Sequence, residues 1–256
     1  MASSSSIVYK GIAGIDACRA GWCVAFQIEN TIQLKLYPQL IQCIEELGWL
    51  DRYLIDIPIG LSEENRLREI DHLAKALLPG KKSASIFISP SRAAVYADHY
   101  AAAKTANRAL LGKSISIQAW NICPKIREID QLLQAHHSYS ARFYECHPEI
   151  TFKMLNGGQV VSASKKTEEG RRARRFLLQQ SIPQSETIIE DALNHYLRKA
   201  VQEDDILDAL ALLRTAQFAS PLGQVVGKHP TDAKGLPMRM VFAPLGLDQT
   251  VDEISN

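Results

Sequence analysis

The sequence lacks an excess of either charge: its 256 residues include 29 lysines and arginines and 28 aspartates and glutamates. Proteins that bind duplex nucleic acid non-specifically usually have a clear basic excess, so this balance weighs mildly against that class. Long apolar runs are also missing, because no stretch approaches the roughly 18 apolar residues that cross a membrane. Residues 1–6 lack the charged and then apolar regions of a secretory signal. We therefore expect no membrane partner and no secretion.

Cysteine occurs without a pattern typical of zinc sites or disulfides. The count is odd and no two cysteines have CxxC spacing, which disfavours a zinc site and favours a reducing compartment, expected to be the cytoplasm. We expect the cysteines to be small buried hydrophobic residues. The five are Cys18, Cys23, Cys43, Cys123 and Cys146.

Several motifs that would identify a common enzyme class are absent as well. There is no GxxxxGKS or GxxxxGKT loop, and Gly11, Gly14 and Gly21 do not form a GxGxxG pattern. No GxSxG elbow is present either. These absences disfavour P-loop enzymes, dinucleotide-binding enzymes and serine hydrolases.

Hydrophobic periodicity predicts one α/β domain over residues 1–256, and a hydrophobic content of 46% can build its core. The expected strands are 7–16, 22–28, 31–37, 52–57 and 141–146, and short turns join the first three into an antiparallel meander. The expected helices are 39–48, 62–79, 93–111, 118–135 (interrupted near Pro124), 166–180, 185–201 and 204–219. This order predicts a mixed sheet flanked by helices, with a core over about 7–220, a helical insertion over about 62–140 and a C-terminal extension over 221–256.

Acidic residues stand at the ends of several of these elements. Asp16 ends the first expected strand, Asp56 lies in the run LIDI just before Pro58, and Glu145 lies inside FYEC. A carboxylate in an apolar strand is costly to bury without a partner. Any one of them could be hydrogen-bonded structure or point outward, so the joint pattern is what indicates a functional site.

Three more acids begin an expected helix. Asp205 and Asp208 share one helix face, and Asp204 could share it too, because it precedes Asp208 by four residues. The helix macrodipole alone favours acids at this end. If the strand acids lie nearby, however, their mutual repulsion calls for cations, and oxygen-only ligands suit Mg²⁺ or Mn²⁺. Two such ions can activate water in phosphodiester hydrolysis.

Basic and histidine residues supply candidate substrate contacts. His147 follows a strand end and could orient water or bind phosphate, although it could equally belong to a turn. Arg92 ends a loop rich in hydroxyl groups, which could contact a phosphate or be a solvated turn. The only basic cluster, which includes Lys165 and Arg171, could follow a nucleic-acid backbone. Its full membership is Lys165, Lys166, Arg171, Arg172, Arg174 and Arg175.

An ordered set of motifs resembles the domain-of-unknown-function 429 family over roughly residues 10–220. No single motif is specific, but many occur in order. They are Gly14-Ile15-Asp16, Gly21-Trp22, Asp56-Ile57-Pro58-Ile59-Gly60-Leu61, Ser85-Ile86-Phe87 with Pro90 and Arg92, Ser116-Ile117-Gln118-Ala119, Pro124-Lys125-Ile126, Glu145 with His147-Pro148-Glu149, and Asp204-Asp205 with Leu207-Asp208-Ala209.

The resemblance implies an RNase H-like fold and a predicted nuclease activity. The helix that carries Asp208 also looks like the last helix of Holliday-junction resolvases. By that likeness, Asp16 is the central metal ligand, Asp205 and Asp208 are the helix ligands, and either Asp56 or Glu145 is the second-strand ligand. Because the central strand lies beside strand four in the RNase H fold, Asp56 fits directly, while Glu145 would come from strand five.

Three functional hypotheses follow. The first is a nuclease that uses Mg²⁺ or Mn²⁺ and a two-metal mechanism, with Arg92, His147, Lys165 and Arg171 contacting nucleic acid. The second is a non-catalytic binding or scaffold protein that keeps the RNase H-like fold. The third is an ATP-binding relative of sugar kinases and actin, which share the Gly14-Ile15-Asp16 start; 256 residues are short for the two domains that ATP binding generally takes there. The type of nucleic acid and the oligomeric state stay open.

Overall fold

The N-terminal strands form an antiparallel meander, as their short connections predict. The structure is a computed structural model and describes residues 11–218 and 222–245. In it, β1 (Gly11–Cys18) pairs with β2 (Gly21–Ile28), which pairs with β3 (Thr31–Tyr37). The expected strand 7–16 begins outside the described residues, and β1 continues two residues beyond Asp16.

Parallel strands extend the sheet on the other side of β1. β4 (Arg52–Ile55) pairs with β1, and β5 (Phe143–Glu145) pairs with β4. The order β3-β2-β1-β4-β5, with only β2 antiparallel to its neighbours, confirms the predicted mixed α/β sheet of the RNase H-like type. Both Asp16 and Asp56 therefore lie at the carboxyl-terminal edge of neighbouring strands.

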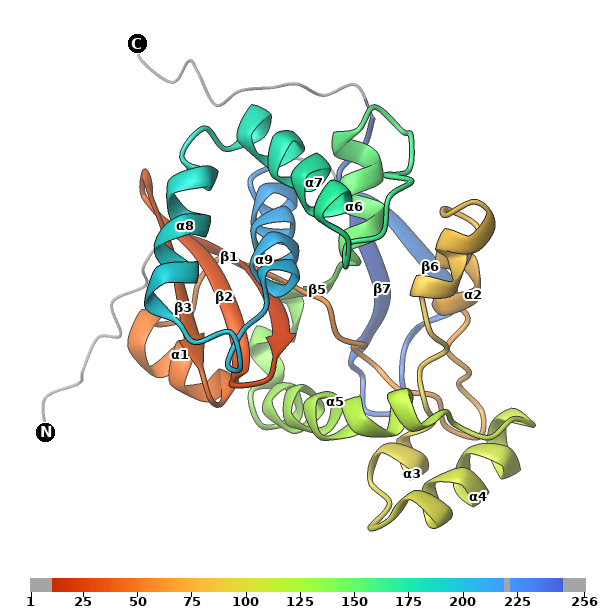
Figure 1. Cartoon of the computed structure of the whole chain (residues 1–256). Coiled ribbons are helices and arrows are strands. Elements are labelled where there is room, and N and C mark those ends of the chain that lie inside the picture. Colours follow the sequence, from red (N-terminus) through yellow and green to blue (C-terminus); the bar gives the residue numbers. More distant parts are fainter. Residues whose placement is uncertain (1–10, 219–221, 246–256) are drawn as a thin grey trace, which may run out of the picture.

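The expected C-terminal extension is part of the sheet. β6 (Gly223–Thr231) and β7 (Pro237–Phe242) form an antiparallel hairpin, and β7 joins β5 through the pair Glu145 and Met240. The sheet thus has seven strands in the described residues, in the order β3-β2-β1-β4-β5-β7-β6 (Figure 1). The glycines and Pro230 in β6 hide the strand pattern in the sequence.

Helices cover both faces of the sheet (Figure 1). α9 packs on β1, β2 and β4 with α6, α7 and α8 beside it, while α1 and α5 pack on the opposite face. None of the described helices is long and apolar enough to cross a membrane. The α-helices are α1 (Leu40–Leu47), α2 (Ile70–Lys75), α3 (Arg92–Val95), α4 (Tyr100–Leu111), α5 (Ile117–Ala135), α6 (Pro148–Leu155), α7 (Glu168–Ser181), α8 (Ser185–His195) and α9 (Glu203–Ala216), and 3-10 turns span Gly80–Ser85 and His137–Arg142.

The prediction of a helix over residues 62–79 is largely wrong. Only α2 is helical there, and Ser62 is not a helix N-cap, because its Oγ accepts a hydrogen bond from the Arg68 nitrogen at 2.9 Å. The expected helix 93–111 is divided into α3 and α4, and His99 caps α4 by accepting from the Ala102 nitrogen. Pro124 does not interrupt α5, which runs through it.

Gly14 allows α9 to lie directly against β1. A Cβ atom at this position would come 2.0 Å from the Leu213 nitrogen and 2.3 Å from the Ala209 oxygen. Because side chains two residues apart in a strand point to the same face, Asp16 faces α9 as well. This close backbone contact brings Asp208, one residue before Ala209, over the end of β1.

The five cysteines match their expected structural role. All are free thiols; Cys23, Cys43, Cys123 and Cys146 are buried and Cys18 is partly buried. Burial raises the pKa of the Cys43 and Cys146 thiols to about 12. They are therefore protonated at neutral pH and act as small apolar side chains.

Candidate functional site

Three carboxylates from three separate elements meet at one edge of the sheet. The Asp56 nitrogen donates to the Ile15 oxygen at 3.0 Å, so Asp56 lies just past β4 and level with Asp16 on β1. Asp208 comes from the second turn of α9, which packs on both strands. Asp16 and Asp208 are only 7% and 1% exposed. This group of Asp16, Asp56 and Asp208 is called the carboxylate cluster below.

The pKa values of all three carboxylates in the cluster are raised. Burial raises the pKa of Asp16 well above its ordinary value, and the charges of Asp208 and Asp56 raise it further. Burial raises the pKa of Asp208 to about 6, against the lowering effect of Lys165. Burial also raises the pKa of Asp56, although His147 and Lys165 lower it. Such mutual repulsion is relieved by a cation, which is why strongly shifted groups often mark functional sites.

Lys165 supplies one cation to the cluster. Its Nζ lies 2.5 Å from an Asp208 oxygen and 3.7 Å from an Asp204 oxygen. Burial works to lower the pKa of Lys165, but the charges of Asp208, Asp16 and Asp56 outweigh it and hold this pKa above its ordinary value. Lys165 therefore stays positively charged beside the cluster over the whole physiological pH range.

Asp16 and Asp56 have no comparable partner. Within the described parts of the chain, neither side chain makes a hydrogen bond or an ion pair. Leaving a carboxylate as deeply buried as Asp16 without a donor is costly unless it binds a cation or keeps its proton. Asp16 therefore carries a carboxylate without a donor among the described residues, beside the charges of Asp56 and Asp208.

Carboxylates are the right kind of ligand for a hard divalent cation, although the described side chains are not already arranged as a metal site. Carboxylate oxygens are the ligands that Mg²⁺ and Mn²⁺ prefer. Among the residues that the structure describes, no group of three or more His, Cys, Asp and Glu side chains has the arrangement of a metal site. Asp208 is bound to Lys165, whose Nζ donates to its Oδ2. Asp16 and Asp56 remain available to an ion.

Glu145 lies on the opposite face of the sheet. Ile15, Ile55 and Glu145 are in register across β1, β4 and β5, so the alternation of side chains that puts Asp16 and Asp56 toward α9 turns Glu145 away. Its carboxylate binds Arg68 Nη2 at 2.5 Å and accepts from the Ile59 nitrogen at 3.0 Å. Burial raises the pKa of Glu145 to about 7, and the Arg68 charge opposes this rise. Of the two second-strand candidates, only Asp56 joins the cluster.

We expect Glu145→Gln to lower the free energy of unfolding by about 2 kcal/mol, because a buried hydrogen bond between charged groups contributes about 1.5–3 kcal/mol. Arg68 keeps its other bonds, to Asp71 and to the carbonyl groups of Ile59 and Gly60. Divalent-cation affinity should stay at the wild-type value in calorimetry. A large loss of cation binding without loss of stability would place Glu145 in the functional site.

The acids at the start of α9 have separate roles. Asp205 Oδ2 accepts a hydrogen bond from the Gln202 nitrogen at 2.8 Å and so caps the helix, although its charge still adds to the raised pKa of Asp16. Asp204 is 6% exposed and pairs with Lys166 at 2.5 Å. Asp208 is thus the helix residue that enters the cluster, while the expected ligand Asp205 is engaged in capping.

A cavity of about 420 Å³ opens beside Asp56 and contains two predicted substrate contacts, His147 and Lys165. His147 Nδ1 accepts from the Glu149 nitrogen, which leaves Nε2 to donate to the Ser85 oxygen at 3.3 Å. Sequence reasoning missed most of the remaining lining, which is basic and rich in hydroxyl groups. The cavity is lined by Asp56, Lys81, Lys82, Ser85, His147, Pro148, Glu149, Ser162, Ser164 and Lys165. The neighbouring Lys81 and Lys82, directly after Gly80, are the sequence feature that could have indicated this basic lining.

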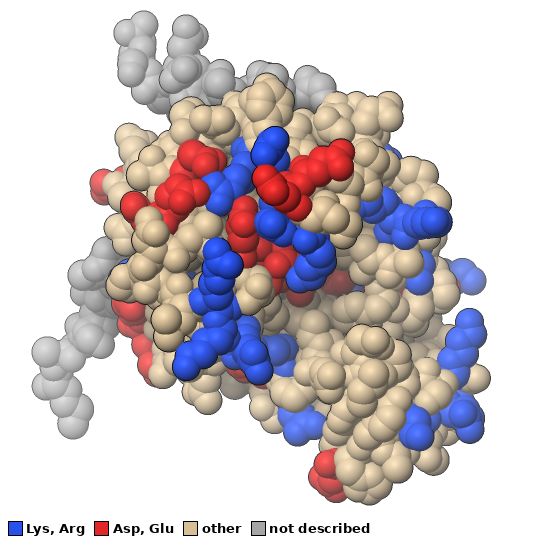
Figure 2. Space-filling view, viewed as in Figure 1, with Lys and Arg blue, Asp and Glu red and all other residues tan. Residues whose placement is uncertain are grey.

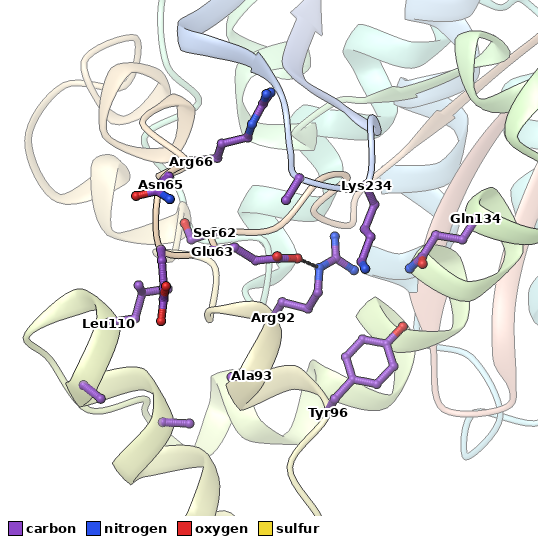
Figure 3. Close-up of a pocket in the computed structure, with 14 residues that line it drawn as sticks. Ser62, Glu63, Asn65, Arg66, Arg92, Ala93, Tyr96, Leu110, Gln134 and Lys234 are labelled. Carbon is purple, nitrogen blue, oxygen red and sulfur yellow. Dashed lines mark ion pairs between the residues drawn. The ribbon is translucent and has the colours of Figure 1, made fainter.

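Arg92 lies away from the cluster. It forms ion pairs with Glu63, Asp130 and Asp232, which join α3 to the preceding loop, to α5 and to the β6–β7 turn. Figure 3 shows Arg92 turned toward Glu63 in a separate cavity of about 1030 Å³. Because carboxylates already surround its guanidinium group, Arg92 acts as a structural connection and is not placed to contact a substrate at Asp16.

The arginines of the basic cluster lie on α7 and are paired with acids. Arg171 pairs with Glu203 at 3.0 Å, and Arg174 is fully buried and pairs with Glu149 at 2.5 Å. Arg175 pairs with three glutamates at 2.5–2.8 Å, which are Glu186, Glu190 and Glu203. Figure 2 accordingly shows acidic and basic side chains intermixed on the upper part of this face. Arg171 is therefore already paired with an acid in this structure.

Comparison with known proteins agrees with the motifs in the sequence. Residues 14–233 match the family described as "Protein of unknown function (DUF429)". No curated protein and no solved structure was found to match the chain. The matched range contains Asp16, Asp56, Asp208 and Lys165 and covers most of the 256 residues. The chain therefore belongs to the DUF429 family.

Proposed function

We propose that this protein is a metal-dependent nuclease that hydrolyses phosphodiester bonds at the carboxylate cluster. The observation that carries the proposal is Asp16, a deeply buried carboxylate with no donor among the described residues and with Asp56 and Asp208 as neighbours. Placing the buried Asp16 and Asp208 beside the partly buried Asp56 is unfavourable for folding, so a bound cation is the simplest reason for the arrangement.

The three carboxylates of the cluster would have different roles in the reaction. Asp16 and Asp56 would hold Mg²⁺ or Mn²⁺, and Asp208 holds Lys165 in place. The ion, when bound, supplies positive charge that acidifies a water molecule and stabilises the charge that develops on a phosphate. Burial of Asp16 against α9, and of Asp208 on that helix, limits the access of bulk water to the carboxylates.

The cavity beside Asp56 supports a phosphate-containing substrate. Lys81, Lys82 and Lys165 carry three positive charges into its lining, and Ser162 and Ser164 add hydroxyl groups. Lys82 is partly engaged, since it pairs with Glu149 at 3.2 Å. Cations and hydroxyl groups are the usual partners of nucleic-acid phosphates. The near-neutral charge of the whole chain favours local contacts at this cavity over a long basic track.

The free cysteines also lead us to propose a reducing compartment such as the cytoplasm.

The test is a cleavage assay on the purified chain with single- and double-stranded DNA and RNA. We expect Mn²⁺ to support cleavage of at least one of these substrates and a chelator to stop it. Binding of Mn²⁺ without cleavage of any substrate would instead support a non-catalytic binding protein. Saturable binding of ATP would point to the kinase and actin relatives.

A further inference from the structure

Lys165 binds Asp208, the carboxylate that a two-ion mechanism would use as a ligand of the second metal ion. Its Nζ lies 2.5 Å from Asp208 Oδ2, and the Asp208 side chain is only 1% exposed. A buried carboxylate bound this closely by an ammonium group is already neutralised. Asp208 can therefore serve a second ion only if Lys165 leaves it.

The backbone holds Lys165 in this position. Gly170 lies so close to the preceding loop that a Cβ atom there would come 1.9 Å from the Ser164 oxygen. Thr167 Oγ1 donates to the same oxygen at 2.8 Å and also caps α7. One residue earlier, the Ala163 oxygen accepts a hydrogen bond from the buried Arg174 at 3.3 Å. Bonds from α7 and its N-cap to two successive carbonyl groups thus fix the loop just before Lys165.

Lys166 provides a contrast on the same loop. Its side chain is 68% exposed and pairs with Asp204 at 2.5 Å, whereas that of Lys165 is 35% exposed. Lys165 also lines the cavity beside Asp56, and Lys166 does not. The two neighbouring lysines therefore differ in access to the site, which makes Lys166 a matched control.

Charge balance sets the number of ions. The three carboxylates of the cluster carry three negative charges when ionised, of which Lys165 compensates one. A single divalent ion compensates the other two, whereas a second one would leave two uncompensated positive charges, against one if Lys165 were absent.

We infer that Lys165 takes the place of a second metal ion, so that the site binds one divalent cation through Asp16 and Asp56 and presents the Lys165 ammonium to a substrate phosphate. This inference rests on the proposed function, since it concerns the cation-binding state of the same cluster. It replaces the two-metal mechanism expected from the sequence with a mechanism that uses one ion and one lysine. Because Lys165 lines the cavity beside Asp56, its charge lies where a phosphate would enter.

The experiment is a calorimetric titration with Mn²⁺ of wild type, Lys165→Met and Lys166→Met. We expect one ion in wild type and in Lys166→Met, and two ions in Lys165→Met, because that change frees Asp208. Two ions in wild type, or one ion in Lys165→Met, would overturn the inference while leaving the proposed nuclease standing. No binding by any of the three proteins would overturn the proposed function and the inference with it.

A second variant keeps the test decisive if Lys165→Met does not fold. In Asp208→Asn the buried charge and the ion pair are both removed, and Asp16 and Asp56 are unchanged. The inference expects this variant to bind one ion with an affinity within about tenfold of wild type, a difference of about 1.4 kcal/mol. Loss of all binding would show that Asp208 is a required ligand and would overturn the assignment of Lys165.

Discussion

Asp16→Asn is expected to weaken Mn²⁺ binding at least 100-fold and to abolish metal-dependent cleavage, while making the metal-free protein more stable. Removing one partner of a buried charge interaction costs about 3–5 kcal/mol, which corresponds to about two to three and a half orders of magnitude in affinity. The asparagine has almost the same shape, so the packing of α9 on β1 should be unchanged. Calorimetry with Mn²⁺ and a cleavage assay measure the two losses.

The gain in stability should depend on pH in a definite direction. The folded pKa of Asp16 is raised above the unfolded value of about 3.9, so the folded state binds the proton more tightly. The unfavourable contribution of Asp16 is therefore absent below pH 4 and grows as pH rises through the folded pKa. Urea denaturation in a chelator should show Asp16→Asn to be more stable than wild type at pH 7 and equal to it in acid.

Asp51→Asn is the matched control for both effects. Asp51 is exposed and lies just before β4, at the other end of the strand from Asp56. This variant should keep wild-type stability and Mn²⁺ affinity. If Asp16→Asn lowered stability at pH 7, the carboxylate of Asp16 would have a partner in solution, and the main support for the proposed cation site would fail.

Gly14→Ala is expected to lower the free energy of unfolding by more than about 3 kcal/mol, the upper end of the usual cost of overpacking a core. The added Cβ would meet the backbone of α9 at Leu213 and Ala209 within 2.3 Å, and backbone atoms cannot rotate aside as a side chain can. The helix must move off β1, which also separates Asp208 from Asp16. Chemical denaturation measures the loss of stability, and Mn²⁺ calorimetry measures the loss of the site.

Gly112→Ala separates this clash from the general cost of replacing a glycine. Gly112 has a φ of 69° at the end of α4, and a Cβ atom there would meet no atom within 4 Å. Only backbone strain applies, so we expect a loss of about 1 kcal/mol. Equal losses in the two variants would mean that α9 can shift on β1 without penalty.

The core of the fold and three of the five predicted carboxylates follow from local patterns. Strands of β-branched and apolar residues with short turns predict β1–β3, and the alternation of side chains places Asp16 beside Asp56 once β1 and β4 pair in parallel. Asp208 is predictable because helix spacing puts it on the apolar face of α9 that packs on the sheet. These relations span few residues or depend only on periodicity.

The rest depends on contacts that periodicity does not encode. Glu145 could not be excluded from the sequence because β5 has only three residues, and a register shift of one residue would turn its side chain to the other face. Its partner Arg68 is 77 residues away, in a segment whose pattern predicts a longer helix. Lys165 reaches Asp208 across 43 residues from a loop, and its backbone is positioned by Gly170 and Arg174. Such loop placements are properties of the packed structure.

The C-terminal hairpin has a consequence for self-association. Without β6 and β7, the short strand β5 would leave unpaired backbone groups at the edge of the sheet, where another chain could add a strand. The hairpin moves this edge outward to β6, whose exposed segment contains Lys228 and Pro230. A charged side chain and a residue without an N–H group both hinder pairing with a second chain. The segment that sequence patterns leave as an extension thus protects the parallel half of the sheet from edge-to-edge aggregation.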